Sequence, residues 1–198
     1  ILGVNSNVPA TYSWTGPAGF TATGNAPIRA NIPTNGGGTY TVNASSTLAG
    51  CTSSASLIIT VNPLPVITLG SNSPVCQGQN INLTSSAIGN SFLGWARGNV
   101  NIGGSDGNKT VTAVTLADSG YYKVSYMSPS SCIKTDSIKV IVKPLPILSG
   151  ISTNSPICSG NTLTFGLNAS PSSTYSWTGP NGFSSTTEDQ SISSASTS

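Results

Sequence analysis

The fold of this chain is decided by residues 117–124, which read Ala-Asp-Ser-Gly-Tyr-Tyr-Lys-Val. A turn leads here into a predicted strand, Gly120 to Met127, in which alternate side chains face the same side. Tyr122 and Val124 therefore share one face of that strand. We expect the ring of Tyr122 to point inward, where its hydroxyl needs a hydrogen-bond partner.

This stretch resembles the D-x-G-x-Y-x-C motif of immunoglobulin domains, with Val124 in place of the second core cysteine. On that resemblance Trp95 matches the core tryptophan, and Leu83 takes the position of the first core cysteine. The resemblance implies a core centred on Leu83, Trp95, Tyr122 and Val124, and a tyrosine corner in which the hydroxyl of Tyr122 bonds to backbone before the strand. Equivalent core residues are expected at Trp14, Tyr40 and Val42, and at Trp177 beside Leu163 or Phe165.

A proline-rich seam divides the chain. Asn62-Pro63-Leu64-Pro65 returns as Lys143-Pro144-Leu145-Pro146, and 81 residues separate Pro63 from Pro144. Residues 174–183 match residues 11–20 at nine of ten positions. A fixed period of this length indicates tandem structural repeats. We predict a partial repeat at 1–64 that lacks its first strand, a complete repeat at 65–146, and a partial repeat at 147–198 that lacks its last strands.

Each repeat has an all-β pattern. Short segments rich in β-branched residues lie between turns of Gly, Pro, Asn and Ser, and no useful apolar pattern with a helical period is present. Seven strands are predicted in the complete repeat, which fits a small Greek-key β-sandwich of the immunoglobulin type. These strands are Val66–Leu69, Gln79–Ser86, Phe92–Arg97, Val100–Ile102, Lys109–Thr115, Gly120–Met127 and Ile133–Val142.

Composition excludes several classes of function. Charged residues are 6% of the chain and the net charge is +2, so there is no basic surface for nucleic acid. No apolar run is long enough to span a membrane in this segment. Without histidine there is no Ser-His-Asp or Cys-His arrangement. We therefore predict no enzyme, no cofactor and no metal site; Asp106 in its glycine-rich loop supplies only one carboxylate for calcium, and Glu188 and Asp189 are adjacent, facing opposite sides of a strand.

The four cysteines follow the period of the repeat. Cys51 and Cys132 lie at one phase, and Cys76 and Cys158 lie at the other. This pattern is typical of disulfides in an oxidising compartment, with buried thiols as the alternative. Zinc is disfavoured because isolated cysteines cannot supply four ligands.

Two disulfide pairings are open. A bond between Cys76 and Cys132 would close a loop of ordinary immunoglobulin size. In the predicted topology, however, these residues lie a strand length apart, roughly 25 Å, whereas a disulfide allows at most ~7 Å between Cα atoms. The favoured hypothesis is a staple between repeats, from Cys76 to a cysteine beyond Ser198 and from Cys132 to one before Ile1.

The whole chain is similar to the tandem immunoglobulin-like repeats of very large surface adhesins of gliding Bacteroidota. The resemblance is carried by the NPLP seam, the N-S-P-[VI]-C-x-G stretch, YSWTGPxGF and the lone cysteine before the last strand. It implies export by the type IX route and an extracellular position at the bacterial cell surface. Asp136-Ser137-Ile138 resembles the O-glycosylation site of exported proteins of this phylum, with Ser137 as the acceptor or a plain surface serine as the alternative. The complete repeat departs from the pattern at Trp95-Ala96-Arg97-Gly98-Asn99, where the other copies have Trp-Thr-Gly-Pro.

Two functions from different classes follow. The first is a structural stalk or filament segment of an adhesin for surface attachment or gliding, whose partners are neighbouring repeats of the same chain, with lateral self-association or surface glycans as further candidates. The second is a non-catalytic carbohydrate-binding or spacer module of a secreted polysaccharide-degrading enzyme. That second function needs exposed aromatic side chains, for which the candidates are Tyr12, Phe92, Tyr126 and Tyr175.

Overall fold

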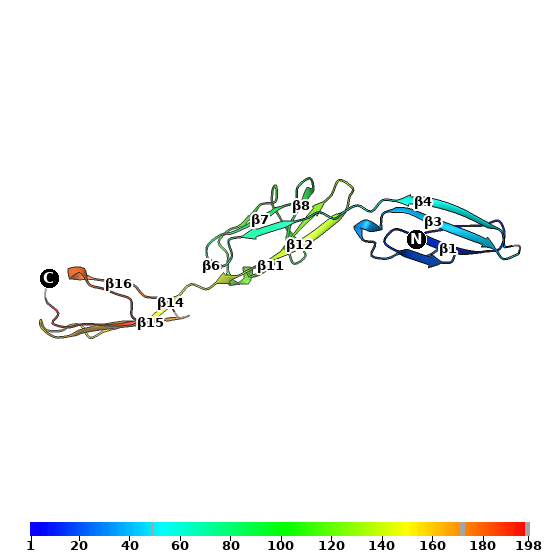
Figure 1. Ribbon diagram of the computed structural model, residues 1–198. Coiled ribbons are helices and arrows are strands. Elements are labelled where there is room, and N and C mark those ends of the chain that lie inside the picture. Colours follow the sequence, from blue (N-terminus) through cyan, green and yellow to red (C-terminus); the bar gives the residue numbers. More distant parts are fainter. Residues whose placement is uncertain (49, 171–172, 197–198) are drawn as a thin grey trace. The chain divides into compact units, whose positions relative to one another are not determined.

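The computed structural model describes residues 1–48, 50–170 and 173–196, and its regular secondary structure is almost entirely β-strand (Figure 1). Ser198, the predicted end of the third repeat, lies outside the described residues. The other elements in the described part are the 3-10 turns η1 (Thr34–Gly36), η2 (Leu116–Asp118) and η3 (Pro180–Gly182). The chain is all-β with the immunoglobulin-like sandwich arrangement, as the strand and turn pattern predicted.

Residues 65–146, here called the central repeat, form two antiparallel sheets and one parallel pair. The sheet orders are β10-β7-β5 and β12-β11-β8-β9, and the parallel pair is β13-β6. Strands that are distant in sequence are neighbours, as in a Greek key. Their bounds are β5 (Thr68–Ser71), β6 (Val75–Cys76), β7 (Ile81–Ser86), β8 (Ser91–Arg97), β9 (Val100–Gly103), β10 (Lys109–Val111), β11 (Gly120–Met127), β12 (Ile133–Val140) and β13 (Val142–Lys143).

The first repeat holds one four-stranded sheet of order β2-β1-β3-β4. Its strands are β1 (Ala10–Gly16), β2 (Phe20–Thr23), β3 (Gly38–Ser46) and β4 (Thr52–Ile59). Ahead of β1, the amides of Leu2 and Val4 donate to the carbonyls of Pro27 and Asn25, both at 3.0 Å. This segment therefore covers part of the core opposite the sheet, and Leu2 packs with Trp14 in the buried cluster.

The third segment has a sheet of order β14-β15-β18 and a separate hairpin of β16 and β17. Its bounds are β14 (Ile147–Thr153), β15 (Leu163–Ser170), β16 (Trp177–Thr178), β17 (Ser184–Ser185) and β18 (Asp189–Ile192). The indole Nε1 of Trp177 donates to the carbonyl of Thr187 at 2.9 Å, and that of Trp14 donates to Gly24 at 2.9 Å. Both acceptors lie ten residues after their tryptophan, so the two segments repeat one local structure.

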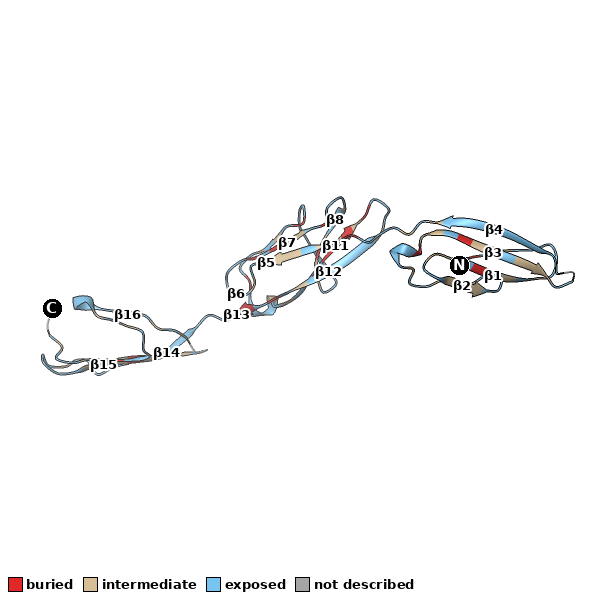
Figure 2. Cartoon of the chain, viewed as in Figure 1, coloured by how far each residue is buried: buried red, intermediate tan, exposed pale blue. Residues whose placement is uncertain are grey.

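The core lies at the positions that the strand pattern indicated (Figure 2). Trp95, Tyr122, Leu83 and Val124 are at most 1% exposed. In the first repeat Trp14, Tyr40 and Val42 are buried as well.

Trp177 departs from the expected core set, because it is only half-buried. The ring of Phe165 contacts it edge-on at 5.0 Å. The period places the equivalents of Tyr122 and Val124 beyond Ser198, so among the described residues after 147 no strand corresponding to β11 packs over Trp177.

Several strand bounds of the central repeat differ from the predicted ones by one or two residues, and two regions differ by more. Lys109–Thr115 was expected as one strand, but β10 ends at Val111, and Ala113 adopts the left-handed conformation with φ 49°. The predicted last strand divides into β12 and β13, and the short β6 was not expected. A two-residue strand pairs by register with a distant segment, and local sequence carries no signal for this.

By contacts the chain forms two compact units, and the boundary between them crosses the central repeat. One unit holds residues 1–68, 85–95 and 124–136, and the other holds 69–84, 96–123 and 137–198. This boundary cuts through β11 and β12, whereas the sheets follow the sequence period. The division at 64 and 146 stays a prediction.

Candidate functional site: the two cysteine-bearing ends of the central repeat

The Asn-Ser-Pro stretch, residues 72–74, carries the chain from the sheet β10-β7-β5 to the parallel pair β13-β6. The side chain of Asn72 donates to the carbonyl of Asn80 at 3.0 Å and accepts from the amide of Asn82 at 2.8 Å. One amide side chain thus makes both bonds that a backbone residue would make beside β7. Asn154 repeats the arrangement in the third segment, with bonds of 3.0 and 2.9 Å. The repeated Asn therefore supplies hydrogen-bond partners to backbone groups beside β7 at the point where β5 ends.

After this crossing the chain pairs with the last strand. The hydroxyl of Ser73 accepts from the amide of Ile141 at 2.8 Å, and the amide of Val75 donates to the carbonyl of Ile141 at 3.1 Å. Cys76 then lies opposite Lys143 in the parallel pair and is exposed. The repeated motif thus places an accessible thiol at the end of the repeat where the chain continues to the second seam. We call this end the exit end.

Cys132 lies immediately before β12, in the turn that follows β11. The amide of Ser128 donates to the carbonyl of Cys132 at 2.9 Å, and the amide of Cys132 donates to the hydroxyl of Ser128 at 3.1 Å. Ser131 has φ 62°, which closes the turn. The turn is therefore tightly bonded and holds the half-buried Cys132 at a defined place.

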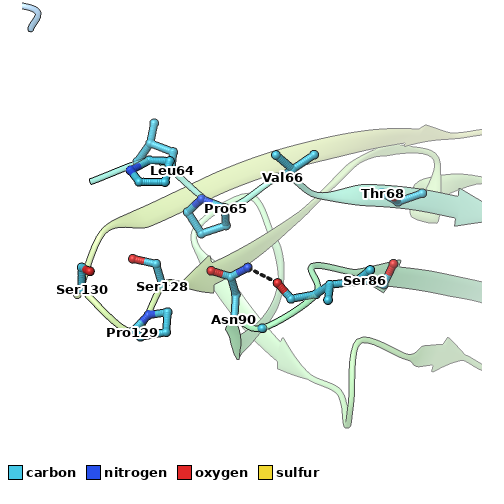
Figure 3. A pocket seen from close by; sticks show the side chains of 12 residues that line it. Leu64, Pro65, Val66, Thr68, Ser86, Asn90, Ser128, Pro129 and Ser130 are labelled. Carbon is cyan, nitrogen blue, oxygen red and sulfur yellow. Dashed lines mark hydrogen bonds between the residues drawn. The ribbon is translucent and has the colours of Figure 1, made fainter. Parts of the chain in front are cut away.

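The first seam lies beside this turn (Figure 3). A groove of about 500 Å³, here called the seam groove, is lined by residues 63–66, the β7–β8 loop and the turn of residues 128–130. Pro65 is buried, whereas Leu64, Val66 and Ile88 expose 54%, 83% and 97% of their surface. We call this the entry end; it combines an uncharged apolar groove with a nearby cysteine.

The register argues against a disulfide between Cys76 and Cys132. Cys132 precedes β12, and Cys76 pairs with Lys143 at the end of β13, eleven residues further along the chain. That length of extended chain corresponds to roughly 35 Å, far beyond the ~7 Å limit between Cα atoms. Cys76, Cys132 and Cys158 are thiols in the structure, and Cys51 is exposed. The staple between repeats stays a proposal.

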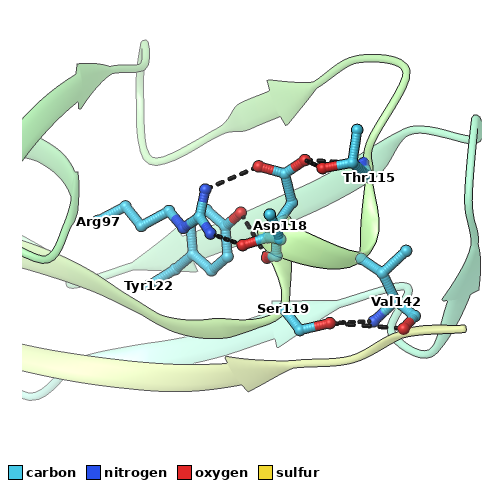
Figure 4. Close-up of polar contacts among 7 residues, drawn as sticks. Arg97, Thr115, Asp118, Ser119, Tyr122 and Val142 are labelled. Carbon is cyan, nitrogen blue, oxygen red and sulfur yellow. Dashed lines mark hydrogen bonds and ion pairs between the residues drawn. The ribbon is translucent and has the colours of Figure 1, made fainter.

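The predicted bond of Tyr122 is present at the exit end (Figure 4). Its hydroxyl donates to the carbonyl of Asp118 at 3.0 Å. In the first repeat the hydroxyl of Tyr40 donates to the carbonyl of Gly36 at 2.8 Å, again four residues upstream. Burial raises the pKa of Tyr122 above its ordinary value. The two tyrosines fix the turn that precedes their strand.

Arginine covers each of these tyrosines, and the sequence did not predict this. Arg97 forms an ion pair with Asp118 at 2.7 Å, donates to the carbonyl of Ala117, and lies 5.7 Å from the ring centre of Tyr122. In the first repeat the covering group is Arg29, 5.6 Å from the ring of Tyr40 and bonded to its hydroxyl. The two arginines come from different sequence positions. The available signal was the replacement of the Trp-Thr-Gly-Pro turn by Trp95-Ala96-Arg97-Gly98.

Replacing Tyr122 by phenylalanine is expected to destabilise the central repeat by about 1 kcal/mol, because the buried ring stays and one hydrogen bond to backbone is lost. Tyr121→Phe is the matched control, since Tyr121 is 60% exposed on the opposite face of the same strand. The loss of stability caused by each substitution is measured by unfolding in urea, with hydrogen exchange of peptides from β11 as the readout. Equal effects of the two substitutions would contradict the assigned bond.

The stability of the exit end is expected to depend on acid pH through Asp118. Bonds from the Thr115 amide and hydroxyl, at 2.7 and 2.9 Å, and then the Arg97 guanidinium hold the pKa of this carboxyl below its ordinary 3.8. The contribution is therefore present above pH ~4 and lost as pH falls further, through the lower folded pKa. Because Asp118 and Arg97 are 22% and 36% exposed, we expect about 1 kcal/mol or less. Asp118→Asn should flatten the stability profile between pH 5 and 2; an unchanged profile would exclude this role.

The aromatic candidates for carbohydrate binding do not form an exposed platform. Tyr126 is 4% exposed, bonds through its hydroxyl to Ser85 at 3.0 Å, and contacts the ring of Phe92 at 5.5 Å. Tyr12 packs against the buried cluster of the first repeat. Tyr175 is half-buried. The rings of Tyr12, Phe92 and Tyr126 pack against other side chains, so no observation favours the carbohydrate-binding alternative.

The remaining predicted positions lie on the surface. Asp106 is exposed in a turn with φ 46°. Across residues 1–48, 50–170 and 173–196, no group of three or more His, Cys, Asp or Glu could hold a metal ion. Within the same residues no helix is long and apolar enough to cross a membrane.

Ser137, the predicted O-glycosylation position, is exposed on β12. Glycosylation there stays a prediction. Intact mass measurement of the native protein would show it as an added mass on the peptide that contains Asp136-Ser137-Ile138.

No protein-family model and no curated protein matches this chain. Similar solved structures include the three N-terminal domains of the Hoc outer capsid protein of bacteriophage RB49, at 12% identity, 94% of this chain, 72% of that chain and a TM-score of 0.41. Murine CEACAM1b is similar at 15% identity, 70% of this chain, 89% of that chain and a TM-score of 0.34. The Ig1-2 module of the Drosophila receptor tyrosine phosphatase DLAR is similar at 19% identity, 68% of this chain, 84% of that chain and a TM-score of 0.34. The likeness concerns the fold alone, and the immunoglobulin-like assignment rests on the strands, register and core described above.

Proposed function

We propose that this chain is an extracellular segment of a stalk or filament in a bacterial cell-surface adhesin, built of immunoglobulin-like repeats that disulfides join. The observation that carries the proposal is the register that sets Cys76 beside Lys143 at the end of β13, while Cys132 lies ahead of β12. A disulfide that stabilises one sandwich would need both cysteines at one place. Two cysteines that are far apart in one repeat can each form a disulfide with a neighbouring repeat, and such disulfides would join successive repeats covalently.

The exit end is suited to resist a pulling force. The chain enters the central repeat ahead of β5 and leaves it after β13, so tension pulls β6 and β13 in opposite directions. Because these strands are parallel and paired at Val75–Val142 and Cys76–Lys143, their bonds would be sheared together instead of opening one by one. The bond between Ser73 and Ile141 adds to the same junction. A stalk segment needs this resistance, whereas a spacer in an enzyme does not.

The seam supports the same function. Pro63 and Pro65 each have a fixed φ and restrict the residue before them, and Pro144 and Pro146 repeat this at the next seam. The seams therefore limit bending. With the family resemblance given above, we propose the gliding-motility type of adhesin, exported by the type IX route.

Non-reducing peptide mapping of the parent protein tests the proposal. Thiols are alkylated on intact cells, the protein is digested without reduction, and linked peptides are sequenced. The expected result is Cys76 linked to an equivalent of Cys132 from another repeat, and Cys132 linked to an equivalent of Cys76. A linked peptide joining Cys76 to Cys132 of the same repeat, or alkylated thiols at both positions, would overturn it.

A further inference from the structure

The strand β4 is the outermost strand of the first repeat's sheet (Figure 1). All eight of its residues pair with β3 along one edge, from Thr52–Ser45 to Ile59–Gly38. Within the described residues no strand pairs with the other edge of β4. In the central repeat the first two strands, β5 and β6, pair with β7 and β13, and neither pairs with β12. Strands at the same positions of the first repeat would therefore leave the outer edge of β4 unpaired as well. This edge therefore offers a row of backbone donors and acceptors.

The edge carries none of the usual protection against pairing. The strand reads Thr-Ser-Ser-Ala-Ser-Leu-Ile-Ile, without a charge or a proline. Leu57 and Ile58 are 38% and 80% exposed. Long uncharged edge strands are templates for adding another strand, and proteins ordinarily prevent this with charges, prolines or bulges.

The equivalent strand of the central repeat is protected. β12, 81 residues later, is also outermost in its sheet and carries Lys134, Asp136 and Lys139. At the same positions β4 has Ser53, Ala55 and Ile58. Position 59 packs against the core, as does position 140, so the alternation places Lys134 and Asp136 on the core-facing side of the edge, a known device against pairing. The same strand of the repeat is thus protected against edge pairing in the central repeat and unprotected in the first repeat.

We propose that β4 is an interaction surface that pairs antiparallel with β4 of a second copy of this chain. A two-fold axis brings identical strands together, and a pairing centred between Ala55 and Ser56 sets Leu57 opposite Ser54. The uncharged strand has no repulsion against itself. The same pairing of β12 would oppose Lys134 and Lys139, and like charges directly opposite are destabilising. A charged partner peptide would find no opposite charge on β4, so a second copy fits better.

The test exchanges the two edges within the whole 198-residue chain. The variant S53K/A55D/I58K gives β4 the charges of β12, and K134S/D136A/K139I removes them from β12. Sedimentation is measured over a range of concentrations with a reductant present, so that cysteine exchange does not link chains. The wild type should shift from monomer to dimer, the first variant should associate about tenfold more weakly, and the second should form larger species.

Backbone hydrogen exchange places the contact. Amides of residues 52–59 should become more protected as the wild-type concentration rises, while those of residues 133–140 do not change. This measurement needs no substitution and decides the matter even where a variant fails to fold. A wild type that stays monomeric, an association that S53K/A55D/I58K leaves intact, or protection that appears outside β4 would each overturn the proposal. Disulfide mapping is independent of all three, so failure here leaves the covalent stalk untouched.

Discussion

Replacing Trp95 by alanine is expected to cost the central repeat about 3–5 kcal/mol, because a fully buried indole is removed from a packed core. Trp95 is 0% exposed. Domains of this size are stable by only about 5–15 kcal/mol, so the substitution removes a large part of the total. We expect the central repeat to unfold at much lower urea concentration, and the bonds that position Cys76 and Cys132 to be lost with it.

Trp177→Ala is the matched control for this prediction. The two tryptophans occupy the same phase of the repeat, but Trp177 is half-buried, so its loss should cost less than about 2 kcal/mol. Because the predicted repeats need not unfold together, a single transition is not assumed, and hydrogen exchange is followed separately in peptides from β7–β11 and from β14–β18. Equal losses from the two substitutions would show that the phase of the repeat alone, and not the packing, sets the cost.

Replacing Gly16 by alanine is expected to destabilise the first repeat by about 1–3 kcal/mol through overpacking. A Cβ at this position would lie 2.6 Å from Cδ1 of the Tyr40 ring, and that ring is held by its bond to Gly36. The ring cannot move without losing this bond, so the strands β1 and β3 would have to shift apart to relieve the clash. Exchange of amides in β1 and β3 measures the effect.

Gly70→Ala separates this clash from the general effect of replacing a strand glycine. A Cβ at Gly70 would lie equally close, at 2.6 Å, to the Thr84 hydroxyl. That hydroxyl can rotate to another staggered position, so a cost below about 1 kcal/mol is expected. A larger loss at Gly70 than at Gly16 would contradict the role given to the Tyr40 ring.

The contrast at position 16 explains why the central repeat departs from the Trp-Thr-Gly-Pro pattern. Arg97 stands where the first repeat has Gly16, counted from each tryptophan. In the first repeat the glycine lets the Tyr40 ring approach, and Arg29 covers that ring from a distant loop. In the central repeat the arginine at the turn itself covers Tyr122. Two local sequences thus solve the same packing problem.

The sequence by itself determined the repeat, the all-β class and the buried positions of the central repeat. The period, the turn residues and the alternation of side chains on a strand are local properties, and together with the resemblance to the immunoglobulin motif they placed Trp95, Tyr122 and Val124 in the core. The bond from Tyr122 to backbone before its strand was also predictable, because a buried hydroxyl must have a partner close in sequence or space.

Only the tertiary structure decided which strands are neighbours. The register of β6 with β13 sets Cys76 beside Lys143, the arginines reach their tyrosines from unrelated positions, and the outermost place of β4 appears only in the order of its sheet. Each of these depends on residues far apart in the chain, for which loop closure and packing, and not local preference, select the partner. The seam and its cysteines were visible in the sequence, whereas the partner strand of Cys76 follows from the register of β6 with β13 in the folded repeat.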